Sequence, residues 1–149
     1  DLVCVSRSDV DDPLASRSEH GFDLDGAHWP SVEHYYQGMK FEDADVRERI
    51  RTSPHPRDCV KVAKRYKKRG RKAWNALKRT VMTRGVYIKC RTHPEVAQVL
   101  LATGECRILE TSQYDYYWGC GRDGRGDNVY GEILMEVRAK LFEVSASDS

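Results

Sequence analysis

Three polar side chains in the segment WPSVEHYYQGMKF, residues 29–41, are spaced so that one face of a helix would carry all of them. An α-helix advances about 100° per residue, so Glu33, Gln37 and Lys40 fall within one stripe, and Trp29 lies just before it. A carboxylate and an amine that share a pocket can act as a general acid/base and as a nucleophile. The spacing leaves two interpretations open, because such a stripe either faces water or lines a pocket.

A second group of candidate residues lies in the glycine-rich segment DYYWGCGRDGRGDNVYG, residues 115–131, at the start of the last predicted helix. Glycines allow close backbone approach, and amides at a helix start attract anions, so the segment has the composition of a phosphate cradle. It lacks the G-x-x-x-x-G-K-[ST] pattern, and an ordinary glycine-rich turn is the other interpretation. Its tryptophan can stack on a base or sugar, or belong to the core. The residues singled out here are Trp118, Gly119, Gly121, Gly126 and Asn128.

Eight lysines and arginines gather in residues 61–72, although the whole chain carries a formal net charge of only +2. Such a run either solvates the end of a helix or contacts the phosphates of a nucleic acid or a dinucleotide. Contact of the second kind would be sensitive to salt and independent of base sequence. We therefore keep DNA as a candidate partner of this basic run.

Composition and spacing argue against several other classes of protein. The five cysteines are scattered and form no C-x-x-C pair, so we expect reduced thiols and an intracellular protein, in the cytoplasm or nucleus. The histidines lack metal-binding spacing such as H-E-x-x-H, so we expect no metal and no cofactor. No apolar run approaches the roughly 20 residues that span a bilayer, and the first residues lack the form of a signal peptide, so we expect no membrane association.

The elements that must position these residues are mostly helical. Ser31 is a plausible N-cap for the helix of the opening stripe, and Pro94 and Gly104 bracket another helix. Helices are predicted at about residues 32–41, 43–51, 57–68, 71–92, 94–103 and 128–142, and strands at 2–5, 22–24 and 106–112. The pattern predicts an α+β fold: a single compact, predominantly helical domain at residues 1–142, monomeric, with a disordered polar tail at 143–149.

The order of several motifs resembles that of a known family. The segment DGAHWPSVEHYYQGMKF is followed by Trp74, Met82 and Lys89, and then by LLATGECRILETSQYDYYWGCGRDGRGDNVYGEILMEVRAKL. Together they resemble the NADAR family, also called YbiA-like, from about residue 14 to residue 141. The resemblance implies a compact, largely helical α+β domain that hydrolyses N-glycosidic bonds. Family members act on ribosyl-amine intermediates of riboflavin synthesis or remove ADP-ribose from guanine bases of DNA.

The resemblance also implies roles for individual residues. The family lysine, which attacks the anomeric carbon of the sugar, falls on Lys40, and the family glutamate falls on Glu33. The aspartate and tryptophan of the D-x-x-W-G motif fall on Asp115 and Trp118. The family asparagine near the start is replaced here by Ser16. The stripe on the first helix would then be the wall of a ribose pocket, where a carboxylate stabilises an oxocarbenium-like carbon and an amine captures it.

Three hypotheses about function follow from this resemblance. The first is an N-glycosyl hydrolase that removes ADP-ribose from guanine in DNA, with Lys40 as nucleophile, Glu33 as acid/base and Asp115 orienting the sugar. Trp118 would stack on the ligand, and the glycine-rich segment would hold the pyrophosphate. The second is an N-glycosidase for a ribosylamino-pyrimidine phosphate. The third is a module that binds ADP-ribose without cleaving it.

Overall fold

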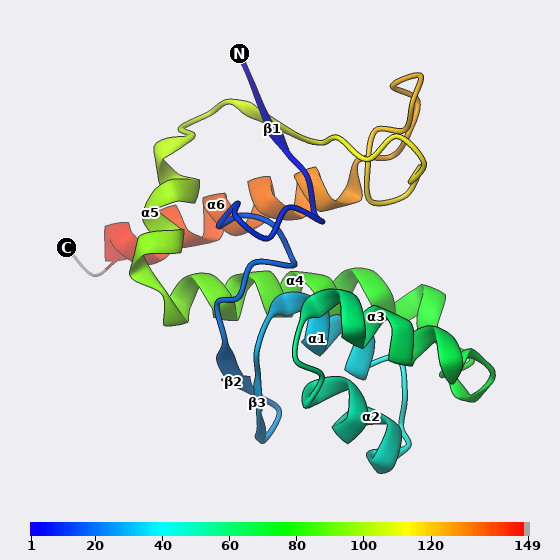
Figure 1. Ribbon diagram of the computed structural model, residues 1–149. Helices are drawn as coiled ribbons and strands as arrows, with labels where there is room; N and C mark the ends of the chain where they lie inside the picture. The colour runs from blue at the N-terminus through cyan, green and yellow to red at the C-terminus, as the bar shows by residue number, and fades with distance from the viewer. Residues whose placement is uncertain (148–149) are drawn as a thin grey trace. The chain divides into compact units, whose positions relative to one another are not determined.

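The structure, a computed structural model, describes residues 1–147 and divides into two compact units (Figure 1). The first unit contains Asp1–Ala15 and the chain from Cys90 onward, and the second unit contains Ser16–Lys89. Within residues 1–147 there are six α-helices, one short 3-10 helix and four short strands. The predicted α+β class with predominant helix is therefore confirmed, whereas a single domain over residues 1–142 stays a prediction.

The first unit is built on a two-stranded parallel sheet. Strand β1 (Leu2–Val5) pairs with β4 (Arg107–Glu110), so that chain segments far apart in sequence lie side by side. Helix α6 (Val129–Ser147) packs against β4, and α5 (Pro94–Ala102) packs against α6. The buried apolar residues of α6 recur every three or four positions, as expected for one helix face. They are Val129, Tyr130, Ile133, Leu134, Val137 and Leu141.

The second unit combines a hairpin with a group of short helices. Strands β2 (Phe22–Leu24) and β3 (Ala27–Trp29) are antiparallel and joined at Asp25 and Gly26. Both turn residues have positive φ, 53° and 81°, as a tight hairpin turn requires. Three helices follow in chain order: α1 (Val32–Gly38), α2 (Ala44–Arg51) and α3 (Pro56–Arg65). The 3-10 helix η1 (Lys67–Arg69) and most of α4 (Trp74–Thr92) complete the unit.

Local capping fixes where the first two helices begin. The Ser31 hydroxyl accepts a hydrogen bond from the backbone N–H of His34, so the predicted N-cap of α1 is confirmed. The carboxylate of Asp43 caps α2 in the same way, by accepting from the amides of Asp45 and Val46. These caps satisfy amides that have no partner inside the helix. The Ser31 cap therefore fixes the residue at which α1 begins, and with it the positions of Glu33 and Gln37 in the helix.

Several element boundaries differ from the predictions. Strand β3 is missing from the prediction because Ala27 and His28 are not among the residues enriched in strands, so only the pairing with β2 identifies it. Helix α4 begins at Trp74 rather than Arg71, since residues 71–74 form a separate turn in which the Trp74 amide donates to the Arg71 carbonyl. Helix α6 continues to Ser147, so a disordered tail from residue 143 is wrong for residues 143–147, which contain no glycine or proline to end a helix. Residues 148 and 149 lie outside the described residues.

Candidate functional site

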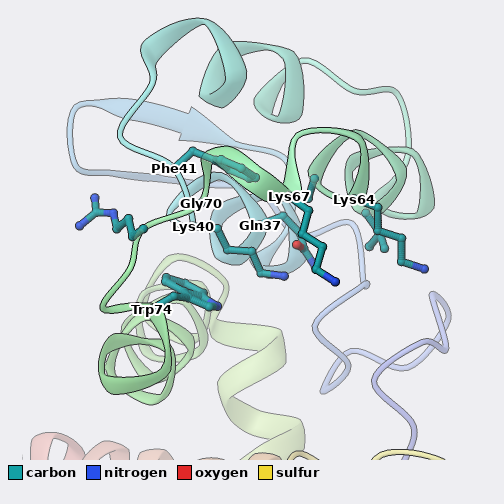
Figure 2. A pocket seen from close by; sticks show the side chains of 10 residues that line it. Gln37, Lys40, Phe41, Lys64, Lys67, Gly70 and Trp74 are labelled. Carbon is teal, nitrogen blue, oxygen red and sulfur yellow. The ribbon is translucent and has the colours of Figure 1, made fainter.

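A cavity of about 470 Å³ opens in the second unit, at the end of α1 (Figure 2). Its walls come from α1 and the turn after it, from α3 and η1, and from the start of α4. The lining residues are Gln37, Lys40, Phe41, Val60, Ala63, Lys64, Lys67, Gly70, Arg71 and Trp74. Four of these side chains are cationic and none is acidic, so the cavity suits an anionic ligand.

Helix α1 places its predicted polar stripe inside the protein rather than in water. All seven residues of α1 are buried, and the exposed fractions of Glu33 and Gln37 are 1% and 6%. One carboxylate oxygen of Glu33, Oε2, and the amide oxygen of Gln37, Oε1, have no hydrogen-bond partner among the described residues. A buried polar atom without a partner is costly, which makes both oxygens candidates for accepting hydrogen bonds from a ligand. The solvated interpretation of the stripe is therefore wrong for Glu33 and Gln37, whereas Lys40 is partly exposed.

Lys40 lies one turn beyond Gln37, after the end of α1. Its backbone amide donates to the Gln37 carbonyl at 3.2 Å, so the chain keeps a helical turn and Lys40 stays on the wall that Gln37 forms. Its amine lies 5.2 Å from the ring centroid of Tyr36, and that ring lies 5.1 Å from the ring of Trp74. In Figure 2 the Lys40 side chain extends between Trp74 and Lys67. The amine is therefore held between an aromatic wall and a cationic one.

The carboxylate of Glu33 has a defined set of neighbours. Arg17 Nε donates to Glu33 Oε1 at 3.4 Å. The Ser16 carbonyl accepts the backbone N–H of Glu33 at 2.9 Å, and Ser16 is itself fully buried. The structure thus brings Ser16 next to Glu33 through its main chain, and the binding of substrate by Ser16 stays a prediction.

Two other buried groups near Glu33 are kept neutral. His34 Nε2 lies 3.0 Å from the Ser53 carbonyl, which can only accept, so Nε2 carries the proton and Nδ1 accepts from the Ser31 hydroxyl. Burial lowers the pKa of His34 below its ordinary value. Burial, together with the negative charge of Glu33, raises the pKa of the Cys59 thiol. Neither group is therefore suited to serve as a cationic acid or a thiolate nucleophile beside Lys40.

The face of α1 that carries Tyr35 is fixed by an ionic network. The Tyr35 hydroxyl donates to Asp25 Oδ2 at 2.9 Å, and Arg84 donates to both oxygens of Asp25. Burial acts to raise the pKa of Asp25, but the hydrogen bonds from Arg84 and Tyr35 outweigh it and lower that pKa overall. This network ties α1 to the hairpin turn and to α4. It holds the helix that presents Glu33 and Gln37.

Trp29, predicted to bind substrate, is a core residue of the second unit. Its indole N–H donates to the Leu24 carbonyl at 3.0 Å, and its ring packs edge-on against Tyr35 at 5.5 Å. A Cβ at Gly38 would lie 2.6 Å from the Trp29 ring, so the helix can approach the indole only because residue 38 is glycine. Trp29 does not line the cavity described above.

Asp115 and Trp118 belong to the first unit, and there Asp115 organises the loop that carries the tryptophan. Asp115 Oδ1 accepts from the amides of Tyr117 and Trp118 at 3.0 and 2.8 Å, and Oδ2 lies 3.8 Å from Arg7 Nη2. The Arg7 guanidinium lies over the Trp118 ring, 5.4 Å from its centroid, and the indole is buried. Arg7, Asp115 and Trp118 therefore form one cluster of cation, carboxylate and aromatic ring.

The glycine-rich segment uses its amides internally. The amides of Cys120, Gly121, Gly124 and Gly126 donate to carbonyls within residues 110–121, and those of Asn128, Val129 and Tyr130 donate to Gly119, Tyr117 and Trp118. The amides at the start of α6 are thus occupied, which argues against the phosphate cradle expected there. Gly119 and Gly126 are required by packing, because a Cβ at either would lie within 2.5 Å of Glu110 or of Gly119. Gly121, with φ of 71°, lies against the Tyr116 ring.

Asn128, also predicted to bind substrate, joins α6 to β4 instead. Its Oδ1 accepts from the Glu110 amide at 2.8 Å, and its Nδ2 donates to the Ile108 carbonyl at 2.9 Å. Its φ of 53° is one that asparagine tolerates better than most residues. Both polar atoms of the side chain are therefore engaged with the protein.

Sequence reasoning named Lys40 and Gln37 among the cavity residues and missed most of the others. Trp74 entered only as part of the family resemblance, and Lys64, Lys67 and Arg71 only as members of the basic run. The pairing of a tryptophan with an adjacent basic run was available as a signal, but the fold decides which cations face inward. Within residues 1–147, no cluster of three His, Cys, Asp or Glu side chains could hold a metal, and no helix is long and apolar enough to cross a membrane.

Comparison with known proteins places this geometry in a family. The model of the NADAR domain matches residues 4–142. N-glycosidase YbiA of Escherichia coli (strain K12) is 38% identical over 118 residues, which cover 79% of this chain and 74% of that protein. A riboflavin biosynthesis protein of Zea mays, PYRR, chloroplastic, is 33% identical over 125 residues, which cover 76% of this chain and 20% of that protein.

A solved structure agrees with the sequence matches. The NMR structure of the E. coli protein YbiA superposes with a TM-score of 0.86 at 33% identity, covering 97% of this chain and 87% of that one. The agreement extends over the described helices and strands of both units, so the shared fold is not limited to the cavity. The chain therefore belongs to the NADAR domain family and is an N-glycosidase.

Proposed function

We propose that this N-glycosidase removes ADP-ribose from ADP-ribosylated guanine in DNA, with Lys40 as nucleophile and Glu33 as acid/base. The observation that carries the proposal is the Lys40 amine and the unpartnered Oε1 of Gln37 in a cavity with cationic and aromatic walls, together with the unpartnered Oε2 of Glu33 one turn earlier on α1. Sugar hydroxyls and base N–H groups are the donors that such oxygens accept. Phosphate groups are the anions that the cationic wall attracts.

The first chemical step would join the sugar to the enzyme. Lys40 loses a proton to Glu33, and its amine forms a bond to the anomeric carbon as the bond from that carbon to the guanine nitrogen breaks. The electron pair of the broken bond stays on the guanine nitrogen, which takes the proton back from Glu33. The carboxylate also stabilises the positive charge that builds up on the sugar as the base leaves.

The second step would release the sugar. The ribose ring opens as its oxygen leaves the anomeric carbon, takes up a proton and leaves an imine to Lys40. Water then adds to the same carbon and expels the lysine amine. The products are restored guanine and free ADP-ribose, and the enzyme is returned to its starting state. One water molecule is consumed in each cycle.

The cavity offers separate places for the parts of the ligand. Lys64, Lys67 and Arg71 would bind the pyrophosphate, a role that the occupied amides of the glycine-rich segment do not favour. The Trp74 ring, beside Tyr36, offers a surface on which a base can stack. Oε2 of Glu33 and Oε1 of Gln37 would accept the ribose hydroxyls.

The positive charge of exposed residues outside the cavity favours a substrate in DNA over a free nucleotide. Lys61, Arg65 and Lys68 are exposed on the same elements, α3 and η1, that supply the cationic wall. A free nucleotide would be satisfied by the cations inside the cavity, whereas a DNA strand also needs contacts along its backbone. We propose that the basic run supplies them to the strand that carries the modified guanine.

Asp115 and Trp118 have a proposed role in the same reaction. The half-buried carboxylate-to-amide contacts support Asp115 as the residue that fixes the loop around Trp118. Replacing Asp115 by asparagine would keep one acceptor oxygen and remove the charge beside Arg7. A loss of turnover in this variant, with unchanged thermal stability, would indicate a role in the reaction rather than in folding.

A second candidate substrate is a ribosylamino-pyrimidine phosphate. The relative in Zea mays is named as a riboflavin biosynthesis protein, which favours this class for the same site. Such a substrate needs the anomeric chemistry of Lys40 and Glu33 and one phosphate site, but no contact outside the cavity.

The deciding experiment offers both substrates to the wild-type protein and to Lys40→Ala. Guanine-ADP-ribosylated DNA is assayed by mass spectrometry for free ADP-ribose and restored guanine, and the pyrimidine phosphate is assayed for the free base. Release from DNA by the wild type alone supports the proposal. Turnover of the pyrimidine phosphate alone would move the assignment to the second candidate. Binding of ADP-ribose in calorimetry with no product from either substrate would indicate a binding module.

A further inference from the structure

The segment Ser16–Ser18 runs along Glu33 and contacts it twice. The Ser16 carbonyl accepts the backbone N–H of Glu33 at 2.9 Å, and Arg17 Nε donates to the Glu33 carboxylate at 3.4 Å. One contact fixes the main chain of Glu33 and the other fixes the end of its side chain. This segment therefore fixes both the backbone position of Glu33 and the orientation of its carboxylate.

The contact with Arg17 distinguishes the two oxygens of the Glu33 carboxylate. Oε1 faces the guanidinium, while Oε2 is buried without a partner among the described residues. A carboxylate without a neighbour on one side can rotate about its terminal torsion, which is soft. The guanidinium removes that freedom by holding Oε1, and so leaves Oε2 as the oxygen presented to a ligand.

A buried lysine anchors the segment from the other side. Lys89 in α4 is 2% exposed, and its amine donates to the Ser18 hydroxyl at 2.5 Å. Ser18 is also buried and lies 3.0 Å from His20 Nδ1 through the same hydroxyl. The buried Lys89 amine thus joins this end of the segment to α4. The reaction proposed above does not use Lys89.

We propose that Arg17 is a positioning residue that holds the Glu33 carboxylate so that Oε2 faces the substrate, and that the contact between Lys89 and Ser18 keeps the Arg17 segment in place. The inference rests on the role of Glu33 in the proposed function. Arg17 acts through Glu33 and does not need to touch the substrate. Small displacements of a catalytic group are costly to the reaction, of the order of 100-fold in rate for about 1 Å.

The test compares Arg17→Met, Arg17→Lys and Glu33→Gln in steady-state kinetics on guanine-ADP-ribosylated DNA. Arg17→Met keeps the bulk of the side chain and removes its donors, so kcat should fall about 100-fold while KM changes by less than about twofold. Arg17→Lys restores a cationic donor and should recover part of kcat. The double variant Arg17→Met with Glu33→Gln should be no slower than Glu33→Gln alone, because the two residues act as one unit.

The matched control is Arg51→Met. Arg51 is an arginine of similar exposure, 28% against 27% for Arg17, and it pairs with Glu48 on α2, away from the cavity lining. Its replacement should leave kcat and KM unchanged. Lys89→Met extends the test, since it should lower kcat by the same route and add nothing to the effect of Arg17→Met.

The remaining outcomes separate failure of the inference from failure of the proposed function. A rise in KM with unchanged kcat in Arg17→Met would overturn the inference, because Arg17 would then bind the substrate directly. Normal kinetics in Arg17→Met with an inactive Glu33→Gln would also overturn it while leaving the proposed function intact. Normal kinetics in Glu33→Gln would contradict the role of Glu33 itself.

Discussion

The backbone N–H of Arg71 donates a 2.8 Å hydrogen bond to the carbonyl oxygen of Lys40. This bond joins the turn after α1 to the turn before α4, and both residues line the same cavity. A Cβ on the neighbouring Gly70 would lie 3.3 Å from the Lys67 carbonyl, so the backbone at Gly70 packs closely against the end of η1. The amine of Lys40 and the cationic wall are therefore parts of one local structure.

Replacing Lys40 by alanine or by arginine should lower release of ADP-ribose by about 1,000-fold or more. Arginine keeps the charge but stays protonated, so it cannot serve as an amine nucleophile. Borohydride added during turnover should reduce the imine and leave a sugar adduct on the peptide that contains Lys40. The control is Lys140→Ala, an exposed lysine of α6. An adduct on any other lysine would contradict the assignment.

Trp74→Ala should raise KM about 10-fold, because stacking of one base on an aromatic ring contributes about 1–3 kcal/mol. Trp74→Phe keeps a ring beside Tyr36 and should lie between alanine and wild type. Leu77→Ala, at an exposed position on the same helix, serves as the control. Steady-state kinetics with thermal melting of each variant separates loss of binding from loss of folding. An unchanged KM in Trp74→Ala would exclude base stacking at this residue.

Neutralising exposed cations outside the cavity should affect DNA and not small substrates. Lys61→Ala combined with Lys68→Ala should reduce the slope of log affinity against log salt by about 2 for DNA. Turnover of a ribosylamino-pyrimidine phosphate by the same variant should not change. Arg49→Ala with Lys140→Ala gives an equal loss of charge elsewhere. Equal slopes in the two double variants would remove the basic run as a DNA contact.

Asn128→Ala should destabilise the first unit by about 3 kcal/mol, because it leaves the buried Glu110 amide and Ile108 carbonyl without partners. Asn128→Gly also removes the side chain but accepts the φ of 53° without strain. The difference between the two variants in urea unfolding therefore isolates the cost of the backbone conformation. Wild-type stability in both would show that these hydrogen bonds contribute nothing net.

Stability should fall in mild acid through His34. Burial lowers the pKa of His34 in the folded protein below its ordinary value of 6.5. Between the two values the unfolded chain binds the proton more strongly, so the free energy of unfolding decreases as pH falls from about 6.5 through the lowered folded-state pKa. His34→Gln should flatten this part of the profile in urea unfolding between pH 8 and pH 5. Parallel profiles for the two proteins would exclude His34 as the cause.

Much of the fold follows from local features of the sequence. Ser31 marks the start of α1 because its hydroxyl accepts from an amide three residues away, and Pro94 and Gly104 mark the ends of α5 for similarly local reasons. The pairing of β1 with β4 is different, because it joins segments about one hundred residues apart and no short pattern encodes a parallel partner. Strand β3 was missed for a local reason: Ala27 and His28 are not among the residues enriched in strands, although its partner β2 is its neighbour in the chain.

The candidate site also has some features that follow from local sequence and others that depend on tertiary packing. The sequence by itself determined that Glu33, Gln37 and Lys40 share one side of a helix and its following turn, because helical spacing is a local property. Only the tertiary structure decided that this side is buried, that Trp74 and three cations of the basic run complete the cavity, and that Arg17 meets Glu33. Only it showed that the amides near Asn128 are already occupied. Burial and hydrogen-bond partners depend on which distant segments pack together, and that is a property of the folded chain rather than of any stretch within it.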